Sequence, residues 1–227
     1  MAEKRTEQDY FNVPIEIYKG FMLDSKGIMF NVAAYACYEF MTAQGCDIES
    51  AIKYYELDFS NIKQVEKTGY QLYNDLPRNT AIVGISKTVL IDYLNNDKTE
   101  LEKATLLGYV AIKSIIGSKG YCNTNNAMML SRMDGSNKNC IGKLSPQIAK
   151  YSKHYWCNKI RNELELSWGL TTKQSRGVNC SFKLTHKGLL QAIDKTSKVS
   201  KLKKLKQDKK NAKEDFLQEQ YKLQRDK

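Results

Sequence analysis

The sequence predicts a mainly α protein with small β elements, an α+β fold that continues into a basic helical tail. Along most of the chain, apolar residues recur at helical spacing behind residues that commonly cap helices. Residues 166–184 instead hold two short alternating stretches around a polar turn that contains a glycine. After residue 194 the chain becomes rich in lysine. These observations divide it into residues 1–97, 98–193 and 194–227.

Composition permits a packed interior and favours an anionic partner. The 227 residues are enough for one or two domains, and 41% of them are apolar. The formal net charge is +11. Residues 195–227 hold 12 Lys or Arg against 5 Asp or Glu, a balance of +7, so the rest of the chain carries only +4. Basic chains favour polyanions, but most of this charge lies in the tail.

Cysteine usage and hydropathy argue against several classes of protein. Six cysteines are spread along the chain without a C-x-x-C pair or a histidine at ligand spacing, so no zinc site is expected. They fit buried thiols in a reducing compartment. The chain shows neither a signal peptide nor an 18-residue apolar run. We expect no metal, no cofactor and no membrane partner, and a cytoplasmic or nucleoid-associated location.

Capping residues divide residues 1–97 into an apolar lead-in and four helices, with a strand before the last helix. The lead-in covers residues 10–18 and the strand residues 80–85. The expected helix starts are Asp24 with Ser25, Asp47, Ser60 and Ser86. Gly45 ends the long first helix, and the polar residues 95–98 mark a domain boundary.

Residues 98–135 predict two more helices. Thr99 and Glu102 form a capping box that starts a helix over residues 101–116. That helix is apolar on nearly all sides, so it should be buried. Thr124 is expected to cap a short helix that stops at Gly135.

The segment from residue 145 to residue 188 predicts a helix followed by two strands. Ser145 followed by Pro146 is a strong helix start, because serine can accept from an orphan N–H and proline needs no donor there. The elements expected in order are a helix over residues 145–164, a strand over 166–170, a loop over 173–179, a strand over 180–184 and a helix capped by Thr185.

The end of this segment resembles a step found in winged-helix regulators. Its residues, Leu184-Thr185-His186-Lys187-Gly188-Leu189, are similar to the L-T-x-K-G-x step by which regulators of the multiple-antibiotic-resistance type leave the wing and enter the next helix. The resemblance implies a C-terminal winged helix-turn-helix over residues 98–193. The turn over residues 136–144 is longer than that pattern has. The alternative is a small α+β domain whose hairpin closes over a core and binds nothing.

The N-terminal part has a fainter resemblance. Val13-Pro14-Ile15 ahead of a helix that begins at Ser25 is similar to the opening of phage and plasmid replication initiators, many of which carry tandem winged helices. Residues 1–97 would then be a diverged second winged helix. A helical accessory or dimerisation domain is an equal alternative, since the candidate second helix-turn-helix offers only Lys53, Lys63, Lys67 and Arg78 as cations.

The winged helix implies a set of DNA contacts. An α-helix fits the major groove, and the N-terminal half of the inserted helix reads base edges. The wing, residues 172–182, would contact the minor groove or the backbone. The candidate DNA-binding residues are Ser145, Gln147, Lys150, Tyr151, Lys153, His154 and Arg161 in the helix, Lys173 and Arg176 in the wing, and Lys138 and Lys143 in the turn before the helix. Tyr155, Trp156 and Trp168 are expected in the core.

We therefore expect a double-stranded DNA-binding protein, either a transcription regulator or a replication initiator of a phage or mobile element. The alternative is a winged-helix protein-interaction module in a larger assembly. An enzyme is not expected, because the chain shows no phosphate-cradling glycine loop, nucleophile elbow or metal-binding His-Glu helix. The tail fits a solvated basic helix with partial disorder, or a dimerising coiled coil. A homodimer through the N-terminal domain or the tail stays open.

Overall fold

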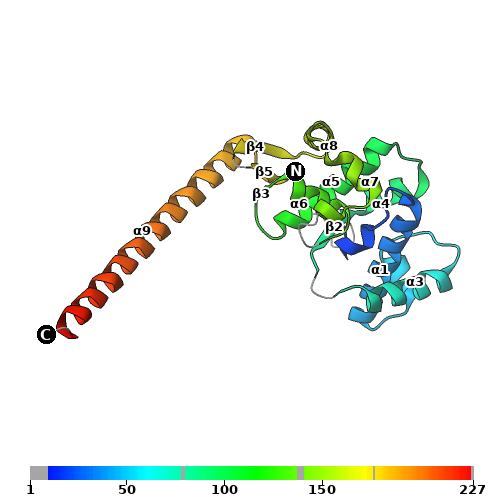
Figure 1. Cartoon of the computed structure of the whole chain (residues 1–227). Coiled ribbons are helices and arrows are strands. Elements are labelled where there is room, and N and C mark those ends of the chain that lie inside the picture. Colours follow the sequence, from blue (N-terminus) through cyan, green and yellow to red (C-terminus); the bar gives the residue numbers. More distant parts are fainter. Residues whose placement is uncertain (1–9, 78–79, 137–140, 176, 226–227) are drawn as a thin grey trace. The chain divides into compact units, whose positions relative to one another are not determined.

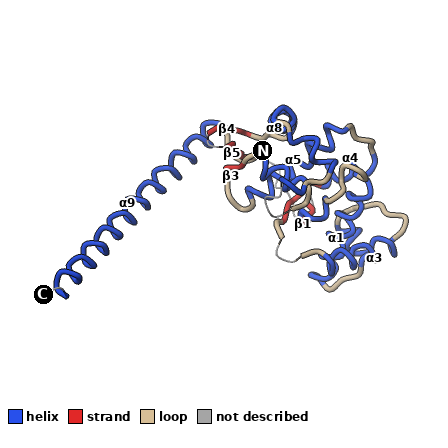
Figure 2. The backbone as a smooth tube through the Cα atoms, viewed as in Figure 1, coloured by secondary structure: helices blue, strands red, loops and turns tan. Residues whose placement is uncertain are grey.

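The computed structural model describes residues 10–77, 80–136, 141–175 and 177–225. These residues are mainly helical with two small antiparallel sheets, which confirms the α+β class (Figures 1 and 2). The chain divides into two compact units, Met1–Lys183 and Leu184–Lys227. In the first unit, the elements up to residue 95 are β1 (Tyr10–Pro14), the 3-10 turn η2 (Ile15–Tyr18), α1 (Ser25–Gln44), α2 (Ile48–Tyr54), α3 (Ile62–Asp75), β2 (Ile82–Ser86) and α4 (Lys87–Asn95).

Most predicted helix starts in this part are confirmed by side-chain caps. Asp24, Asp47 and Ser86 each accept a hydrogen bond from the backbone N–H three residues on. The start of α3 is shifted by one residue, because Asn61 and not Ser60 accepts from the N–H of Gln64. Strands β1 and β2 pair with each other in antiparallel register. No hairpin follows α3 among residues 80–98, so the wing of a second winged helix is not seen there.

The rest of the first unit carries the second sheet. Its elements are α5 (Glu100–Ile116), β3 (Cys122–Thr124), α6 (Asn126–Met133), η3 (Ile141–Lys143), α7 (Pro146–Ala149), η4 (Lys150–Ser152), α8 (His154–Ser167), β4 (Thr171–Ser175) and β5 (Gly177–Ser181). The strand order is β3-β5-β4, with both pairs antiparallel. The capping box of Thr99 and Glu102 is present, and α5 is buried over most of its length, as predicted. Strand β3 was not predicted, and Asn125 takes the capping role expected of Thr124.

The predicted continuous helix over residues 145–164 is wrong. Lys153 has extended backbone angles, φ −65° and ψ 137°, and this residue separates η4 from α8. The break changes which side chains face inward. Helix α8 buries Cys157, Ile160, Arg161 and Leu164, whose spacing of three, one and three residues marks one helical face.

The boundaries predicted after residue 164 are also wrong. Helix α8 continues to Ser167, so the expected strand over residues 166–170 does not form, and Leu166 is 83% exposed. Gly169, at φ +68°, then redirects the chain, and the N–H of Leu170 donates to the carbonyl oxygen of Leu164. The expected loop over residues 173–179 is mostly strand. The second strand ends at Ser181 instead of spanning residues 180–184.

One hydrophobic core continues across the predicted boundary at residues 95–98. The hydroxyl of Tyr109 in α5 donates to the carbonyl oxygen of Gly84 in β2, and Tyr93 in α4 donates to that of Glu102 in α5. Residues before and after this boundary therefore share one interior, and a smaller second cluster fills the space between α1, α2 and α3.

The second unit is dominated by one long helix, α9 (His186–Arg225). Thr185 caps it as predicted, since its hydroxyl oxygen accepts from the N–H of Gly188. Every residue from 194 to 211 is exposed, including Val199, Leu202 and Leu205. Across the described residues, no helix combines the length and the hydropathy that crossing a membrane requires.

Substitution of Gly69 by alanine tests the packing of α3 on α1. The added Cβ would lie 2.5 Å from the carbonyl oxygen of Ala34 and 2.6 Å from the Cβ of Tyr38, so the helices must separate. Overpacking of this kind costs about 1–3 kcal/mol. We expect a corresponding loss in the free energy of unfolding measured by urea titration. Gly142→Ala is the matched control, because its Cβ meets no atom within 4 Å; equal stability of the two variants would contradict the packing.

Candidate nucleic-acid interface

Ser145 does not offer the phosphate anchor that the sequence predicted. Its backbone N–H donates to one carboxylate oxygen of Asp134 at 2.8 Å, and its hydroxyl donates to the other at 2.6 Å. The hydroxyl therefore caps nothing in α7, which is only four residues long. A carboxylate at this position repels a phosphate, so Ser145 holds the turn before α7 in place.

Tyr151 and Lys150 meet at the carboxylate of Glu100, at the start of α5. The Tyr151 hydroxyl donates to Glu100 at 2.8 Å, and Lys150 forms an ion pair with the same oxygen. These two donors, Lys150 first, hold the pKa of Glu100 below its ordinary value. Burial, followed by the bond to Glu100, raises the pKa of Tyr151. Tyr151 is 1% exposed, so its predicted contact with base edges is wrong, while the side chain of Lys150 stays 47% exposed.

Arg161 is also inside the protein and not on the predicted DNA-binding face. Its guanidinium donates to the amide oxygen of Asn158 at 3.0 Å and to that of Asn126, at the start of α6. Only 4% of the residue is exposed. A buried cation with these partners ties α8 to α6, so Arg161 has a structural role.

The exposed chemistry gathers at the start of α8. We define the α8 surface as Lys153, His154, Tyr155, Trp156 and Lys159. Tyr155 is 65% exposed, although the sequence placed it in the core. Its ring lies 5.4 Å from the partly buried ring of Trp156, and the Lys159 amine lies 5.2 Å from that ring. Cations interleaved with aromatic rings can contact both phosphates and bases.

The remaining predicted helix residues flank this surface. His154 is exposed, and its Nδ1 accepts from the amide of Asn158 at 3.1 Å, so its Nε2 carries the proton in the neutral ring. Gln147 is half-buried in α7 and Lys143 is exposed in η3. Lys138 lies outside the described residues. Because the chain is extended at Lys153, the single helix predicted over residues 145–164 is absent, and only the first two turns of α8 carry the exposed residues of this set.

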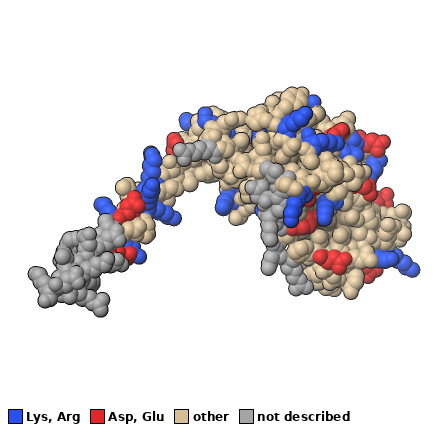
Figure 3. All heavy atoms as spheres, in the orientation of Figure 1, with Lys and Arg blue, Asp and Glu red and all other residues tan. Residues whose placement is uncertain are grey.

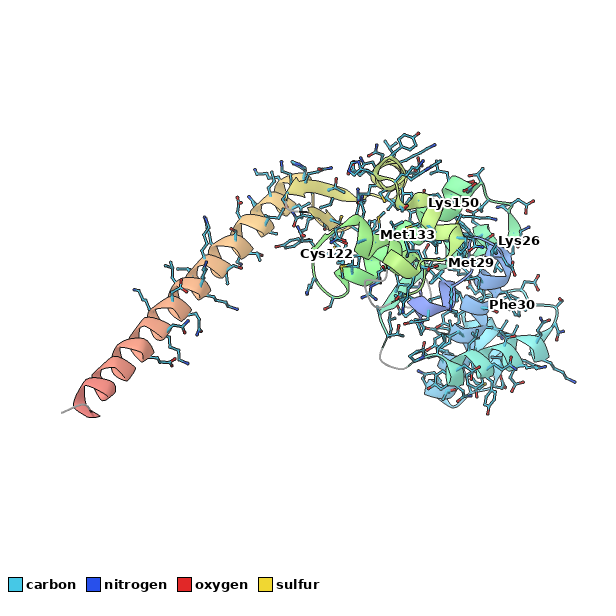
Figure 4. All side chains as sticks on the ribbon, viewed as in Figure 1. Lys26, Met29, Phe30, Cys122, Met133 and Lys150 are labelled. Carbon is cyan, nitrogen blue, oxygen red and sulfur yellow. The ribbon has the colours of Figure 1, made fainter. Side chains whose placement is uncertain are left out.

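The hairpin of β4 and β5 carries the predicted wing. Lys173 is exposed on β4, opposite Asn179 in the register. Gly177 begins β5 at φ +102°, a backbone angle that suits glycine and permits a tight turn. Arg176, the other predicted wing residue, lies outside the described residues. Figures 1 and 4 place Lys150 on the α7 side of α8 and the hairpin on the other side of that helix.

Charge on the body is mixed. Figure 3 shows Lys and Arg side chains interspersed with Asp and Glu over the face in view. Several lysines of this unit are paired with acids, including Lys26 with Asp97 and Lys98 with Asp92. Lys153, Lys159 and Lys173 have no ion pair among the described residues. Within the same residues, no group of three or more His, Cys, Asp or Glu is placed to hold a metal ion.

Comparison with known proteins returned no relative. No protein-family model, curated protein or solved structure matches the chain. Function is therefore inferred from the chain's own surface chemistry and topology.

Replacing Arg161 by methionine tests its structural role. The change leaves the amide oxygens of Asn126 and Asn158 without their donor, and we expect a loss of about 2–4 kcal/mol in the free energy of unfolding. Lys159→Met, on the half-exposed side of the same helix, should change stability by less than about 0.5 kcal/mol. If Arg161→Met has the same free energy of unfolding as the native chain in a urea titration, Arg161 has no structural role.

Proposed function

We propose that the chain is a double-stranded DNA-binding protein that uses the α8 surface and the β4–β5 hairpin. The observation that carries the proposal is the cluster at the start of α8, where Lys153, His154 and Tyr155 are exposed and the half-buried Lys159 lies over the ring of half-buried Trp156. Such a protein would act as a transcription regulator or as a replication initiator of a phage or mobile element. The second of these uses draws on the faint resemblance of residues 13–25 to initiators.

The order of elements supports a winged helix. Helix α5, strand β3 and helix α6 are followed by the short elements η3, α7 and η4, and then by helix α8 and strands β4 and β5. Strand β5 lies between β3 and β4 in the sheet. The resemblance at residues 184–189 implies three helices followed by a wing. Helices α5, α6 and α8 and the β4–β5 hairpin would take these places, with α8 as recognition helix in place of the predicted helix over residues 145–164. The positioning helix is α6, which Arg161 ties to α8.

The first turns of α8 are suited to the major groove. An α-helix fills that groove, and its N-terminal side chains reach base edges. Lys153 and Lys159 supply positive charge for phosphate or guanine, while Tyr155 supplies a ring and a hydroxyl. Lys173 on the hairpin would bind a phosphate further along the duplex. Each neutralised phosphate releases counterions, so affinity should fall steeply with salt.

One observation favours the alternative of a protein-interaction module. Tyr155 and Leu166 are 65% and 83% exposed, and large exposed apolar side chains are common in protein interfaces. The aromatic ring suits either partner, but Lys153, Lys159 and Lys173, which form no ion pair within the described part of the chain, favour a polyanion. A homodimer through residues 1–97 or α9, and a cytoplasmic or nucleoid-associated location, stay predictions.

Lysine substitutions in α8 test the proposed interface. We expect Lys153→Ala and Lys159→Ala each to lower duplex affinity and to reduce the slope of log affinity against log salt by about one, because each removes one phosphate contact. Fluorescence anisotropy with a duplex selected from a random library, at two salt concentrations, measures both quantities. Tyr155→Ala should reduce the preference for the selected duplex over a random one.

Lys63→Ala is the matched control, because it removes the same charge from the exposed face of α3. Its affinity should stay near that of the native protein. If Lys63→Ala and Lys153→Ala weaken binding equally, the α8 surface is not the interface and general electrostatics accounts for the affinity. Absence of any duplex binding by the folded native chain favours the protein-interaction module.

Truncation after Ile193 separates the tail from the body. Residues 195–227 carry a net charge of +7, so their loss should lower affinity for selected and random duplexes by a similar factor and reduce the salt slope. The preference between the two duplexes should remain. If the truncated chain keeps no preference, sequence recognition does not reside in residues 1–193.

A further inference from the structure

Cys122 and Cys180 lie directly opposite each other on β3 and β5. They are register partners in an antiparallel pair, so their side chains project from the same face of the sheet. Directly opposed residues of antiparallel strands have Cα atoms about 4.5 or 5.5 Å apart, and both spacings fall within the range of disulfides. On the neighbouring register position, Asn123 donates to Asn179 at 3.2 Å, which fixes the alignment. Figure 4 labels Cys122 beside this sheet.

The two thiols have unequal surroundings. Cys180 is fully buried, whereas Cys122 is 7% exposed. The hydrogen bond from Cys180 lowers the pKa of Cys122 and burial opposes this effect, while Lys119 adds a smaller lowering. The same hydrogen bond and burial raise the pKa of Cys180. Cys122 is thus the better nucleophile of the pair, and it is the more exposed of the two thiols.

A buried cation lies close enough to influence the pair. The charge of Arg161 favours the thiolate form of Cys180 and of Cys157, against stronger opposing effects. Among the residues described, Arg161 has no carboxylate partner, and its Nε has no hydrogen-bond partner. The charge of Arg161 therefore eases loss of the Cys180 proton, although the pKa of Cys180 stays raised overall.

We propose that Cys122 and Cys180 form a reversible, oxidation-sensitive dithiol that closes into a disulfide between β3 and β5. The oxidant is hydrogen peroxide. The Cys122 thiolate attacks the peroxide and becomes a sulfenic acid, and one peroxide oxygen leaves as hydroxide, which takes up a proton to give water. The Cys180 sulfur then attacks the sulfenic sulfur, loses its proton and releases a second water as the S–S bond forms.

The disulfide would join the middle strand of the sheet to its β3 edge. Strand β5 also pairs with β4, so the bond restrains the strand from which the hairpin extends. A thiol reductant reverses it by exchange. The inference concerns the chemistry of this sheet and does not depend on DNA binding.

The test uses the reduced full-length chain treated with a small excess of hydrogen peroxide, blocked with N-ethylmaleimide and mapped without reduction. We expect a cross-linked peptide joining Cys122 to Cys180, a mass loss of about 2 Da for the two hydrogens removed, and recovery with dithiothreitol. Cys46→Ser, which removes a half-exposed cysteine elsewhere, should leave the cross-link intact. Cys122→Ser should leave Cys180 as a free thiol.

Three results would overturn the proposal. Both thiols could stay reduced while Cys46 is oxidised in the same sample. Oxidation of Cys46 would show that the peroxide was active, so the Cys122–Cys180 pair would not react with it. Cys122 could pair with a different cysteine. The bond could instead join two chains, visible as a dimer on a non-reducing gel. Because the native chain is the main sample, misfolding of a variant cannot mask these outcomes.

Discussion

The carboxylate of Glu100 decides how the segment before α8 is placed. It accepts the hydroxyl of buried Tyr151 and pairs with Lys150, so the turn η4 is held against the start of α5. The chain must then leave η4 in extended conformation at Lys153 before α8 begins. The thiol of Cys157 donates to the carbonyl oxygen of Tyr151 at 3.4 Å and closes this corner. The hydrogen bond between Tyr151 and Glu100, which are 51 residues apart in the sequence, therefore helps to set where α8 starts.

Because of that break, two side chains of α8 have the opposite exposure to the one predicted from the sequence. Arg161 turns into the interior, where it ties α8 to Asn126, and Tyr155 turns out to solvent. The face left for a partner consists of Lys153, Tyr155 and Lys159, with Trp156 packed behind them. The unpaired lysines and the exposed ring together suit a nucleic acid, in which negative phosphates lie beside flat bases. Arg161 of this helix also lies close enough to Cys180, one member of the proposed dithiol, for its charge to lower the pKa of that thiol against larger opposing effects.

Local signals in the sequence were sufficient for the α+β class and for most of the helix starts. The capping box at Thr99, the caps at Asp24 and Asp47 and the helix start at Thr185 each involve residues three apart, and the structure confirms them. The break at Lys153 depends on a carboxylate 51 residues from Tyr151, which periodicity cannot detect. One signal was available, because the step of five from Tyr155 to Ile160 departs from the helical period. Of the predicted site residues, Lys150, Lys153, His154 and Lys173 are exposed, as a surface contact requires, whereas Tyr151 and Arg161 are buried; DNA contact by the exposed residues stays a prediction.

The most direct test of this account is photo-cross-linking of the native chain to a bound duplex, followed by mass mapping of the attached peptides. The account predicts attachment within residues 153–159, with Tyr155 the principal site, and further attachment in the β4–β5 hairpin. Attachment confined to α9, or to Tyr151 after local opening of η4, would contradict it. The surface at the start of α8 would then not contact the duplex.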